Sequence, residues 1–256
     1  MSARRRTVVL AAAIILGVFL VVGGVRLLNA QPSGSRPSQA RPGPVILVPG
    51  YGGSQGSLRV LAARLAAAGR STQVLALPGD GTGDLLVQAK TLDTAVRAAL
   101  RNGAPSVDIV GYSAGGVVTR LWVDRYDGAA VARRIVTLGS PLHGAQIAGA
   151  GVALAPDACP QACRELAPGS SLLRDIDGKA LPSGLPWLSI WTQDDETVQP
   201  PESARLDGAV NLPVQSICPA NRVTHGGLPT DPAVTALVIG ALGTAPLHAP
   251  ATCPAA

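Results

Sequence analysis

The chain has 256 residues, of which 14% are charged and 3% aromatic, and its formal net charge is +5 at pH 7. Four of the 21 basic residues lie within the first 30 positions, so residues 31–256 carry 17 basic side chains against 16 acidic ones. This near-neutral body lacks the positive surface of nucleic-acid-binding proteins, which excludes nucleic acid as the expected partner.

Residues 1–30 have the pattern of a targeting segment. A basic start (Arg4, Arg5, Arg6) precedes the uncharged run TVVLAAAIILGVFLVVGGV at positions 7–25. As a helix, this run would be about 28 Å long, close to the hydrocarbon thickness of a bilayer. Ala30 is a small residue of the kind that a signal peptidase prefers, so a cleaved signal peptide and a retained single-pass membrane anchor both stay open. Either one predicts an extracytoplasmic protein, secreted or tethered to the membrane.

A Pro/Ser/Gly-rich linker, QPSGSRPSQARPGP, occupies residues 31–44 and is too polar to join a core. The folded domain is therefore expected over residues 45–256. This length fits a single domain with a sizeable core.

Short β-branched runs alternate with Ala/Leu/Arg stretches in this domain, a pattern typical of βαβ units and a parallel sheet. We predict strands at 45–48, 73–77, 107–110, 135–138, 187–191 and 210–217. Helices are expected at 58–68, 84–101, 114–126 and 232–242, with Gly69 as the cap that ends the first. Residues 143–186 break the alternation but are too few for a separate cap domain. Functional side chains are expected at the carboxyl ends of the strands.

Four cysteines lie outside the targeting segment, an even number that favours disulfides in an exported chain. Nearness in sequence favours pairing Cys159 with Cys163 and Cys218 with Cys253. A zinc site is the alternative, but C-x3-C without a second close Cys or His pair is a poor ligand set.

Residues 111–115 (GYSAG) form a G-x-S-x-G element between a predicted strand and a predicted helix. This is the setting of the nucleophile elbow of α/β-hydrolases, in which the serine lies on a tight strand-to-helix turn. The pattern alone also fits an ordinary Gly-rich turn. Its position between strand and helix favours Ser113 as a nucleophile.

A serine nucleophile needs a base, and in this fold the base is a histidine that follows both the serine and the acid. His143 comes too early to leave room for the acid, and His248 lies in a Pro/Ala-rich tail. His225 follows the last predicted strand and precedes a helix. We therefore expect His225 to be the general base.

The acid is expected after the strand at 187–191, where Asp194, Asp195 and Glu196 follow one another. Either aspartate could orient the imidazole, and the residues alone do not choose between them. Solvation of a charged surface loop is the alternative for the whole cluster. Asp175, Asp177 and Asp207 lie away from strand ends.

Backbone amides must stabilise the oxyanion that develops when serine attacks a carbonyl. One donor is expected from Ala114, the residue after the nucleophile. The loop PGYGGS after the first strand lets the backbone approach a substrate closely, which favours the amide of Tyr51 as the second. A plain turn is the alternative for this loop.

These motifs together resemble the small bacterial extracellular lipases, the class-2 lipase group of minimal α/β-hydrolases. In chain order, the segments that carry the resemblance are VILVPGYGGS, VDIVGYSAGGVVTRLW, VARRIVTLGSPLHG, SIWTQDDETVQP, ARLDGAVN and RVTHGG, and they extend over residues 45–243. The resemblance implies that Asp195 is the acid and that His143 is a pocket or packing residue. The chain departs from the family at Pro49, where many relatives have His, and in a longer Cys-bearing segment that predicts partial cover over the cleft.

The function expected from this resemblance is hydrolysis of a lipid or other hydrophobic ester by a monomeric enzyme that needs no cofactor or metal. Acyl transfer to a cell-envelope acceptor, or hydrolysis of a polyester, would use the same Ser113, Asp195 and His225. An inactive envelope-binding module is the alternative outside enzymes.

Overall fold

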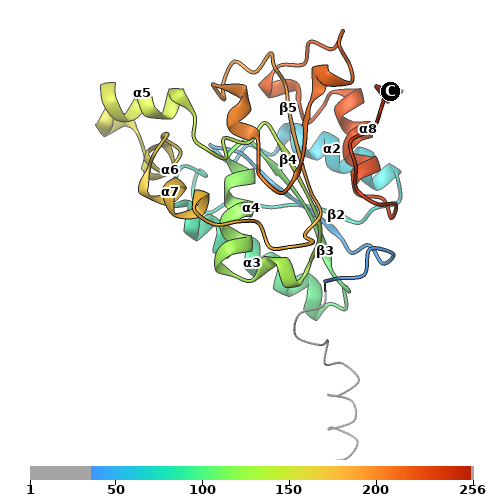
Figure 1. Cartoon of the computed structure of the whole chain (residues 1–256). Coiled ribbons are helices and arrows are strands. Elements are labelled where there is room, and N and C mark those ends of the chain that lie inside the picture. The colour runs from blue at the N-terminus through green and yellow to red at the C-terminus, as the bar shows by residue number, and fades with distance from the viewer. Residues whose placement is uncertain (1–35, 255–256) are drawn as a thin grey trace, which may run out of the picture. The chain divides into compact units, whose positions relative to one another are not determined.

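A computed structural model describes residues 36–254, so the predicted targeting segment lies outside the described residues. The domain is built on one six-stranded sheet with the order β2-β1-β3-β4-β5-β6, in which every neighbouring pair is parallel (Figure 1). This confirms the predicted α/β class. The strands are β1 (Val45–Val48), β2 (Thr72–Val74), β3 (Val107–Tyr112), β4 (Ala132–Leu138), β5 (Trp187–Trp191) and β6 (Val210–Pro213).

Helices cover both faces of this sheet. Strand β1 consists of four fully buried apolar residues, since a strand covered on both faces has no solvent side. Its alternate residues supply two cores: Ile46 packs with α3 (Leu85–Arg101) and α4 (Ala114–Arg125), whereas Leu47 packs with α2 (Gly56–Ala67) and α8 (Pro232–Ala241). The sheet is therefore the middle layer of three.

Local signals set several helix ends. The Asp84 carboxylate accepts hydrogen bonds from two amides of the first turn of α3, and Asp231 accepts one from Val234 at the start of α8. Gly69 follows α2 with φ +81°, the left-handed conformation that glycine adopts without steric cost. The predicted cap at Gly69 is confirmed.

Two predicted strands end early. β2 ends at Val74 instead of residue 77, because the carbonyl of Leu75 accepts a hydrogen bond from the Gln55 side chain as the chain leaves the sheet. β6 ends at Pro213 instead of residue 217. Proline has no N–H to donate, and the chain continues into the 3-10 turn Val214–Ser216.

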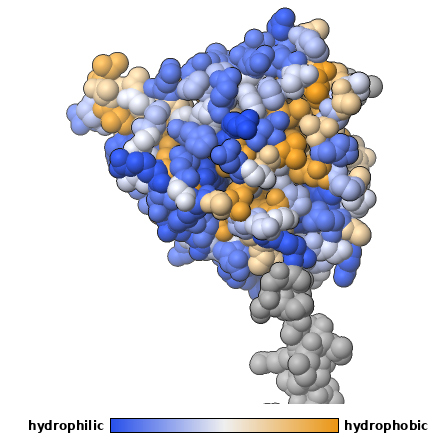
Figure 2. Space-filling view, in the orientation of Figure 1, coloured by the Kyte–Doolittle hydropathy of each residue, from blue (hydrophilic) through white to orange (hydrophobic). Residues whose placement is uncertain are grey.

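The sequence predicts no helix or strand in residues 143–186. The structure has three short helices there: α5 (Gln146–Leu154), α6 (Gln161–Glu165) and α7 (Ser171–Asp177). Helix α5 projects from the body of the domain, and hydrophobic residues gather at this end (Figures 1 and 2). No large cap domain is present in residues 36–254, and no helix within them is both long and apolar enough to span a membrane. The remaining short 3-10 helices are Gly128–Ala130, Pro156–Ala158, Pro201–Ala204 and His225–Gly227.

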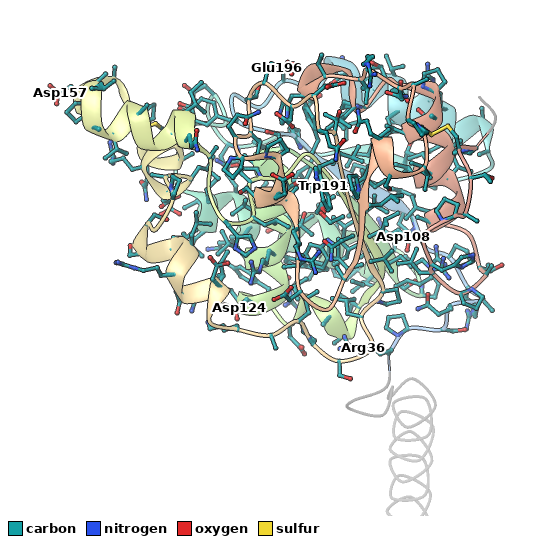
Figure 3. The ribbon with its side chains drawn as sticks, turned by 45° about the horizontal axis from the view of Figure 1, so that its top comes forward. Arg36, Asp108, Asp124, Asp157, Trp191 and Glu196 are labelled. Carbon is teal, nitrogen blue, oxygen red and sulfur yellow. A yellow bond between two sulfur atoms is a disulfide. The ribbon has the colours of Figure 1, made fainter. Side chains whose placement is uncertain are left out.

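The described end of the predicted linker contacts the domain. Arg36 donates hydrogen bonds to the carbonyls of Ala129 and Ser183, and the Gln39 side chain donates to the carbonyl of Arg133 (Figure 3). Backbone carbonyls of the 3-10 turn at residues 128–130, of the turn before β5 and of β4 thus hold these residues ahead of β1.

A buried ion cluster ties the start of β3 to its neighbours. Asp108 is fully buried, and one of its carboxylate oxygens lies 2.5 Å from both the Arg70 and the Arg133 guanidinium (Figure 3). Arg133 also donates to the carbonyls of Leu242 and Gly243 after α8. The Asp108 carboxylate therefore neutralises the two guanidinium groups, and Arg133 links β3 and β4 to the chain after α8.

Asp108→Ala should lower the free energy of unfolding by about 3–5 kcal/mol, because it leaves two guanidinium groups, one fully buried, without their counter-ion. Urea unfolding measures the change. Asp207→Ala is the matched control, because Asp207 is 99% exposed, and we expect a change below about 0.5 kcal/mol. Equal losses in the two variants would contradict the role assigned to the cluster.

Candidate active site

Ser113 lies on the turn between β3 and α4 with φ 52° and ψ −128°. A non-glycine residue at positive φ is strained, and such strain persists where the surrounding structure enforces it. Here the Ser113 amide donates to the carbonyl of Leu138, 2.8 Å away, at the end of β4. The turn presents the Ser113 side chain at the carboxyl end of the sheet.

The glycines of the G-x-S-x-G element are required by close backbone contacts. A Cβ on Gly115 would lie 2.2 Å from the carbonyl oxygen of Val48, and one on Gly111 would lie 2.7 Å from the Cα of Gly116. Real Cβ atoms do not approach other atoms so closely. Glycine at these two positions therefore allows α4 to begin in direct backbone contact with β1 and β3.

Three loops bring Ser113, His225 and Asp195 together. The His225 Nε2 lies 3.0 Å from the Ser113 Oγ, and the His225 Nδ1 lies 2.7 Å from the Asp195 Oδ2. His225 is 6% exposed and Asp195 is 2% exposed. With Nδ1–H donating to the carboxylate, Nε2 is free to accept the serine proton.

The turn after β5 separates the two adjacent aspartates. The Asp195 Oδ1 accepts hydrogen bonds from the amides of Thr197 (2.9 Å) and Val198 (2.7 Å), which leaves Oδ2 for the imidazole. The Asp194 side chain is exposed instead. The geometry thus sets Asp195, and not Asp194, against His225.

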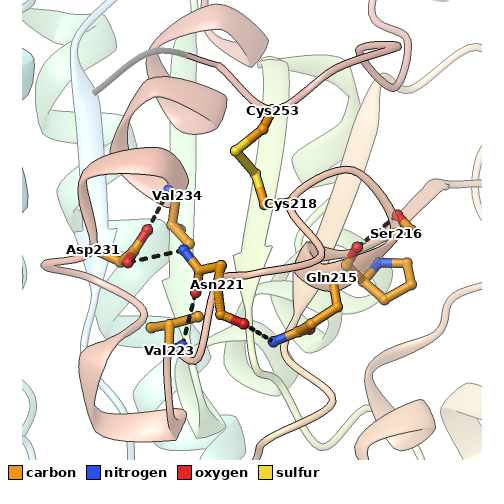
Figure 4. The surroundings of a disulfide bond; sticks show 9 residues. Gln215, Ser216, Cys218, Asn221, Val223, Asp231, Val234 and Cys253 are labelled. Carbon is orange, nitrogen blue, oxygen red and sulfur yellow. Dashed lines mark hydrogen bonds between the residues drawn. A yellow bond between two sulfur atoms is a disulfide. The ribbon is translucent and has the colours of Figure 1, made fainter.

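A polar network positions the loop that carries His225. Thr192 donates to the carbonyl of Val223 (2.6 Å), and the Asn221 side chain accepts from the Val223 amide and donates to Asp231. Figure 4 shows the contacts of Asn221 with Val223 and Asp231, near the Cys218–Cys253 disulfide. The sequence analysis does not single out Asn221, although Asn is a residue type whose side chain commonly bonds the backbone two residues on and so stabilises a turn.

Two further residues contact His225 from behind. The Tyr112 hydroxyl donates to the His225 carbonyl (3.2 Å), and the two rings lie with centroids 5.3 Å apart. The Glu196 carboxylate accepts from the His225 amide (3.0 Å). Burial, together with the charges of Asp195 and Glu196, raises the pKa of the Tyr112 phenol to about 12. Tyr112 occupies the variable position of the motif, where sequence spacing assigns no role.

The expected oxyanion donors border the same space as Ser113. Ala114 begins α4, where backbone amides have no intrahelical acceptor. In residues 36–254, no backbone carbonyl outside a helix or strand accepts from the Tyr51 or Ala114 amide. The Gly53 amide, in contrast, donates to the Gly50 carbonyl of the same loop, and the Gly52 amide donates to the Gly81 carbonyl in the loop before α3. Both candidate amides are thus available to a substrate oxygen.

A cavity of about 230 Å³ opens beside Ser113. Its walls are mostly apolar and come from four loops and from α5 and α6. The lining residues are Tyr51, Ser113, Ala114, Pro141, Ala145, Ile147, Ala148, Cys163, Leu166, Thr197 and Val198.

The other histidines lie apart from Ser113. The His143 Nδ1 is 3.0 Å from the Asp177 Oδ1 and its Nε2 is 3.0 Å from the carbonyl of Arg205, and His143 does not line the cavity. His248 is exposed in the C-terminal tail, where Nδ1 lies 2.9 Å from the carbonyl of Pro246.

The four cysteines form two disulfides, Cys159–Cys163 and Cys218–Cys253. Within the part of the chain that the structure describes, no three His, Cys, Asp or Glu side chains gather as metal ligands would.

No protein-family model and no curated protein matches the sequence. Several solved structures match the fold. Lipase B from Aspergillus fumigatus aligns with a TM-score of 0.67 and 20% identity, over 82% of this chain and 55% of the lipase. The mature lipase BlEst2 from Bacillus licheniformis aligns with a TM-score of 0.57 and 18% identity, over 71% of this chain and 85% of that one. Bromoperoxidase from Bacillus anthracis aligns with a TM-score of 0.50 and 14% identity, over 81% of this chain and 91% of the bromoperoxidase.

These likenesses establish the α/β-hydrolase fold, in agreement with the predicted fold class. The chain spans about half the length of the fungal lipase. A bromoperoxidase shares the fold with the lipases, so the fold does not fix the chemistry. The activity must be argued from the site.

The raised pKa of Tyr112 predicts a loss of stability in alkali. Tyrosine in an unfolded chain ionises near pH 10, whereas Tyr112 keeps its proton to about pH 12. The unfolded state therefore binds fewer protons between these values, and the free energy of unfolding falls as pH rises. Tyr112→Phe should flatten this fall, as measured by urea unfolding across the interval. Tyr51→Phe makes the same chemical change at a half-exposed side chain and is the control; identical slopes for Tyr112→Phe and the wild type would refute the assignment.

Proposed function

We propose that the protein is a carboxylic ester hydrolase that works through an acyl-enzyme on Ser113. The observation that carries the proposal is the continuous hydrogen-bond chain from Ser113 Oγ through His225 to the buried Asp195. A poor nucleophile, a base and an orienting carboxylate in this order are the requirements of serine catalysis.

In the first half of the reaction, Ser113 Oγ attacks the ester carbonyl carbon while its proton moves to His225 Nε2. The tetrahedral intermediate then collapses, the bond to the alcohol oxygen breaks, and His225 returns the proton to the leaving alcohol. In the second half, a water molecule attacks the acyl carbon while His225 takes its proton. The bond between the acyl carbon and Ser113 Oγ then breaks, His225 returns the proton to Ser113 Oγ, and the acid leaves.

The other groups stabilise charge and position. Asp195 holds the imidazole in the tautomer that leaves Nε2 unprotonated, and it stabilises the imidazolium that forms. The amides of Tyr51 and Ala114 donate to the oxyanion, and the positive end of α4 adds a favourable potential there.

The apolar cavity favours a lipid or another hydrophobic ester as the substrate, in keeping with the resemblance to small extracellular lipases. We propose that the enzyme is monomeric and acts outside the cytoplasm, secreted or tethered by residues 1–30. The two disulfides support an oxidising compartment. The proposed steps require no cofactor.

Ser113→Ala should lower the hydrolysis of p-nitrophenyl butyrate at least about 10⁴-fold, because it removes the group that forms the acyl-enzyme. A fluorophosphonate probe should label the wild type at Ser113 and leave the variant unlabelled. Equal hydrolysis by both proteins would refute the proposal, and so would labelling of a different serine.

Asp195→Asn should reduce kcat about 10⁴-fold, because an amide stabilises neither the required tautomer nor the imidazolium. Asp194→Asn is the matched control: it makes the same chemical change one residue away on an exposed side chain, and we expect its kcat to stay within about twofold of the wild type. Steady-state kinetics on a soluble ester measures kcat for both variants. A larger loss of kcat in Asp194→Asn than in Asp195→Asn would show that Asp195 is not the acid.

A further inference from the structure

The Cys159–Cys163 disulfide lies beside the proposed active site but has no part in the proposed reaction steps. Cys163 lines the cavity at Ser113, and Cys159 is buried. The bond joins residues four positions apart in the chain, whereas Cys218–Cys253 joins residues 35 positions apart. A disulfide that closes a short loop constrains the unfolded chain less and stabilises the fold less. The main effect of the Cys159–Cys163 bond is therefore local to the cavity.

Helix α5 is supported by this disulfide. Ala148 is the one buried residue of α5, and the helix packs mainly on α6 and on the 3-10 helix Pro156–Ala158. A Cβ on Gly151 would lie 3.0 Å from the Cys163 Sγ and 3.5 Å from the Cys159 Sγ, so the α5 backbone lies directly against both sulfurs. An element with so few buried contacts opens easily. The position of α5 therefore depends on the bond beneath it.

The other side of the disulfide is fixed to the body of the domain. Cys163 belongs to α6, where the Ala162 amide donates to the Thr82 carbonyl (3.0 Å). The carboxylate of Glu165, the last residue of α6, accepts from the Leu85 amide (2.8 Å) at the start of α3. The disulfide thus joins a firmly held helix to the weakly packed α5.

Helix α5 and the chain after α6 form the inner wall of the cavity. Ala148 and Leu166 line it and are buried, whereas Tyr51 and Ile147 line it and are exposed, which places them at its mouth. The contact of Gly151 with the two sulfurs leaves no space between α5 and α6, so the cavity ends at this wall.

The size of the cavity indicates how much of a substrate it can enclose. Its volume is about 230 Å³. An apolar cavity of about 150 Å³ binds benzene, so a cavity of this size encloses roughly nine carbon atoms.

We propose that the Cys159–Cys163 disulfide limits the length of the acyl group that the site accepts. While the bond is intact, an acyl chain of up to roughly nine carbons lies inside the cavity, and a longer chain has to displace α5. Reduction of the bond by a dithiol releases α5 and admits longer chains. The inference rests on the proposed ester hydrolysis for the presence of an acyl group in this cavity.

The reduction is an ordinary thiol–disulfide exchange, and the half-buried Cys163 is the accessible partner. One thiolate of the dithiol attacks the Cys163 Sγ, the S–S bond breaks, and Cys159 leaves and takes up a proton. The second thiolate of the dithiol attacks the mixed disulfide, which leaves the reductant oxidised and Cys163 as a thiol. The two sulfurs then separate to van der Waals distance, and Gly151 on α5 has to move.

A binding test uses the full chain carrying Ser113→Ala, so that it does not depend on catalysis. Calorimetric titration with sodium octanoate and sodium dodecanoate, below their micelle concentrations, gives the two Kd values. Four further methylenes, if buried, would tighten binding about 200-fold. A closed wall predicts that dodecanoate binds within about threefold of octanoate, because its last carbons stay outside the cavity. Adding Cys159→Ser/Cys163→Ser should tighten dodecanoate relative to octanoate at least about tenfold.

Cys218→Ser/Cys253→Ser is the matched control, because it removes the disulfide that does not line the cavity. Its ratio of the two Kd values should equal that of the parent. This variant also allows a reversible test, since Cys159–Cys163 is then the one remaining disulfide. Dithiothreitol should change the ratio in the same direction as Cys159→Ser/Cys163→Ser does, and reoxidation should restore it. An unchanged ratio after complete reduction, or equal changes in both double variants, would overturn the proposal.

A kinetic test uses active enzyme and p-nitrophenyl esters. In the wild type, kcat/KM for the dodecanoate should be at least about tenfold lower than for the octanoate, and Cys159→Ser/Cys163→Ser should remove most of this difference. Ala148→Leu fills the inner wall and should change the preference in the opposite direction, lowering kcat/KM for the octanoate relative to the butyrate at least about fivefold.

The outcomes separate the two hypotheses. Hydrolysis with the same chain-length preference in the wild type and in Cys159→Ser/Cys163→Ser would overturn the role of the disulfide and leave the proposed function intact. Absence of hydrolysis in the wild type would refute the proposed function, and the Kd ratios of the Ser113→Ala proteins would still show whether the disulfide closes the cavity.

Discussion

Strand β1 and helix α4 approach each other with no side chain between them, and this contact holds Ser113 at its positive φ. The Gly115 position faces the Val48 carbonyl at a separation that leaves no room for a Cβ. If the helix moved away, the serine turn would lose the support that offsets its strain. Gly50 adds a second close contact, since a Cβ there would lie 2.9 Å from the Ser113 Cβ. The proposed oxyanion donors on either side of Ser113 thus depend on the same backbone packing.

His225 is positioned by hydrogen bonds, whereas Ser113 is positioned by close backbone packing. Asp195 contacts the ring, Glu196 the amide and Tyr112 the carbonyl, so ring and backbone are fixed independently. The asparagine turn and the Cys218–Cys253 link fix the loop from the opposite side. The proposed nucleophile and base are thus both constrained, as catalysis would require of groups that must be positioned before substrate arrives.

The hydrophobic pattern of the sequence predicts best those strands that are covered by helices on both faces of the sheet. The bounds of β1 and β5 agree with the sequence prediction because buried parallel strands are continuous apolar runs. The ends of β2 and β6 do not, since they depend on a Gln55 side-chain contact and on Pro213. The sequence does not predict helices α5 to α7, because α5 contains two glycines and because α6 and α7 have only five and seven residues. Helices this short depend on tertiary contacts, which local sequence does not reveal. The choice between Asp194 and Asp195 depends on the turn after β5, in which two backbone amides donate to the Asp195 carboxylate. The local sequence does not indicate which of the two side chains points toward His225.

Ser113, Asp195 and His225 come from three separate loops, which follow β3, β5 and β6, so the site forms only when distant parts of the chain meet. Asp195 and Ser113 lie 30 and 112 positions from the histidine that they contact. Such pairings have high contact order, and their loop-closure entropy is recovered only when the intervening strands have docked. If Ser113 is the nucleophile that we propose, a partly folded chain holds an unactivated hydroxyl, and the cooperative step that completes the sheet also brings this hydroxyl to its base.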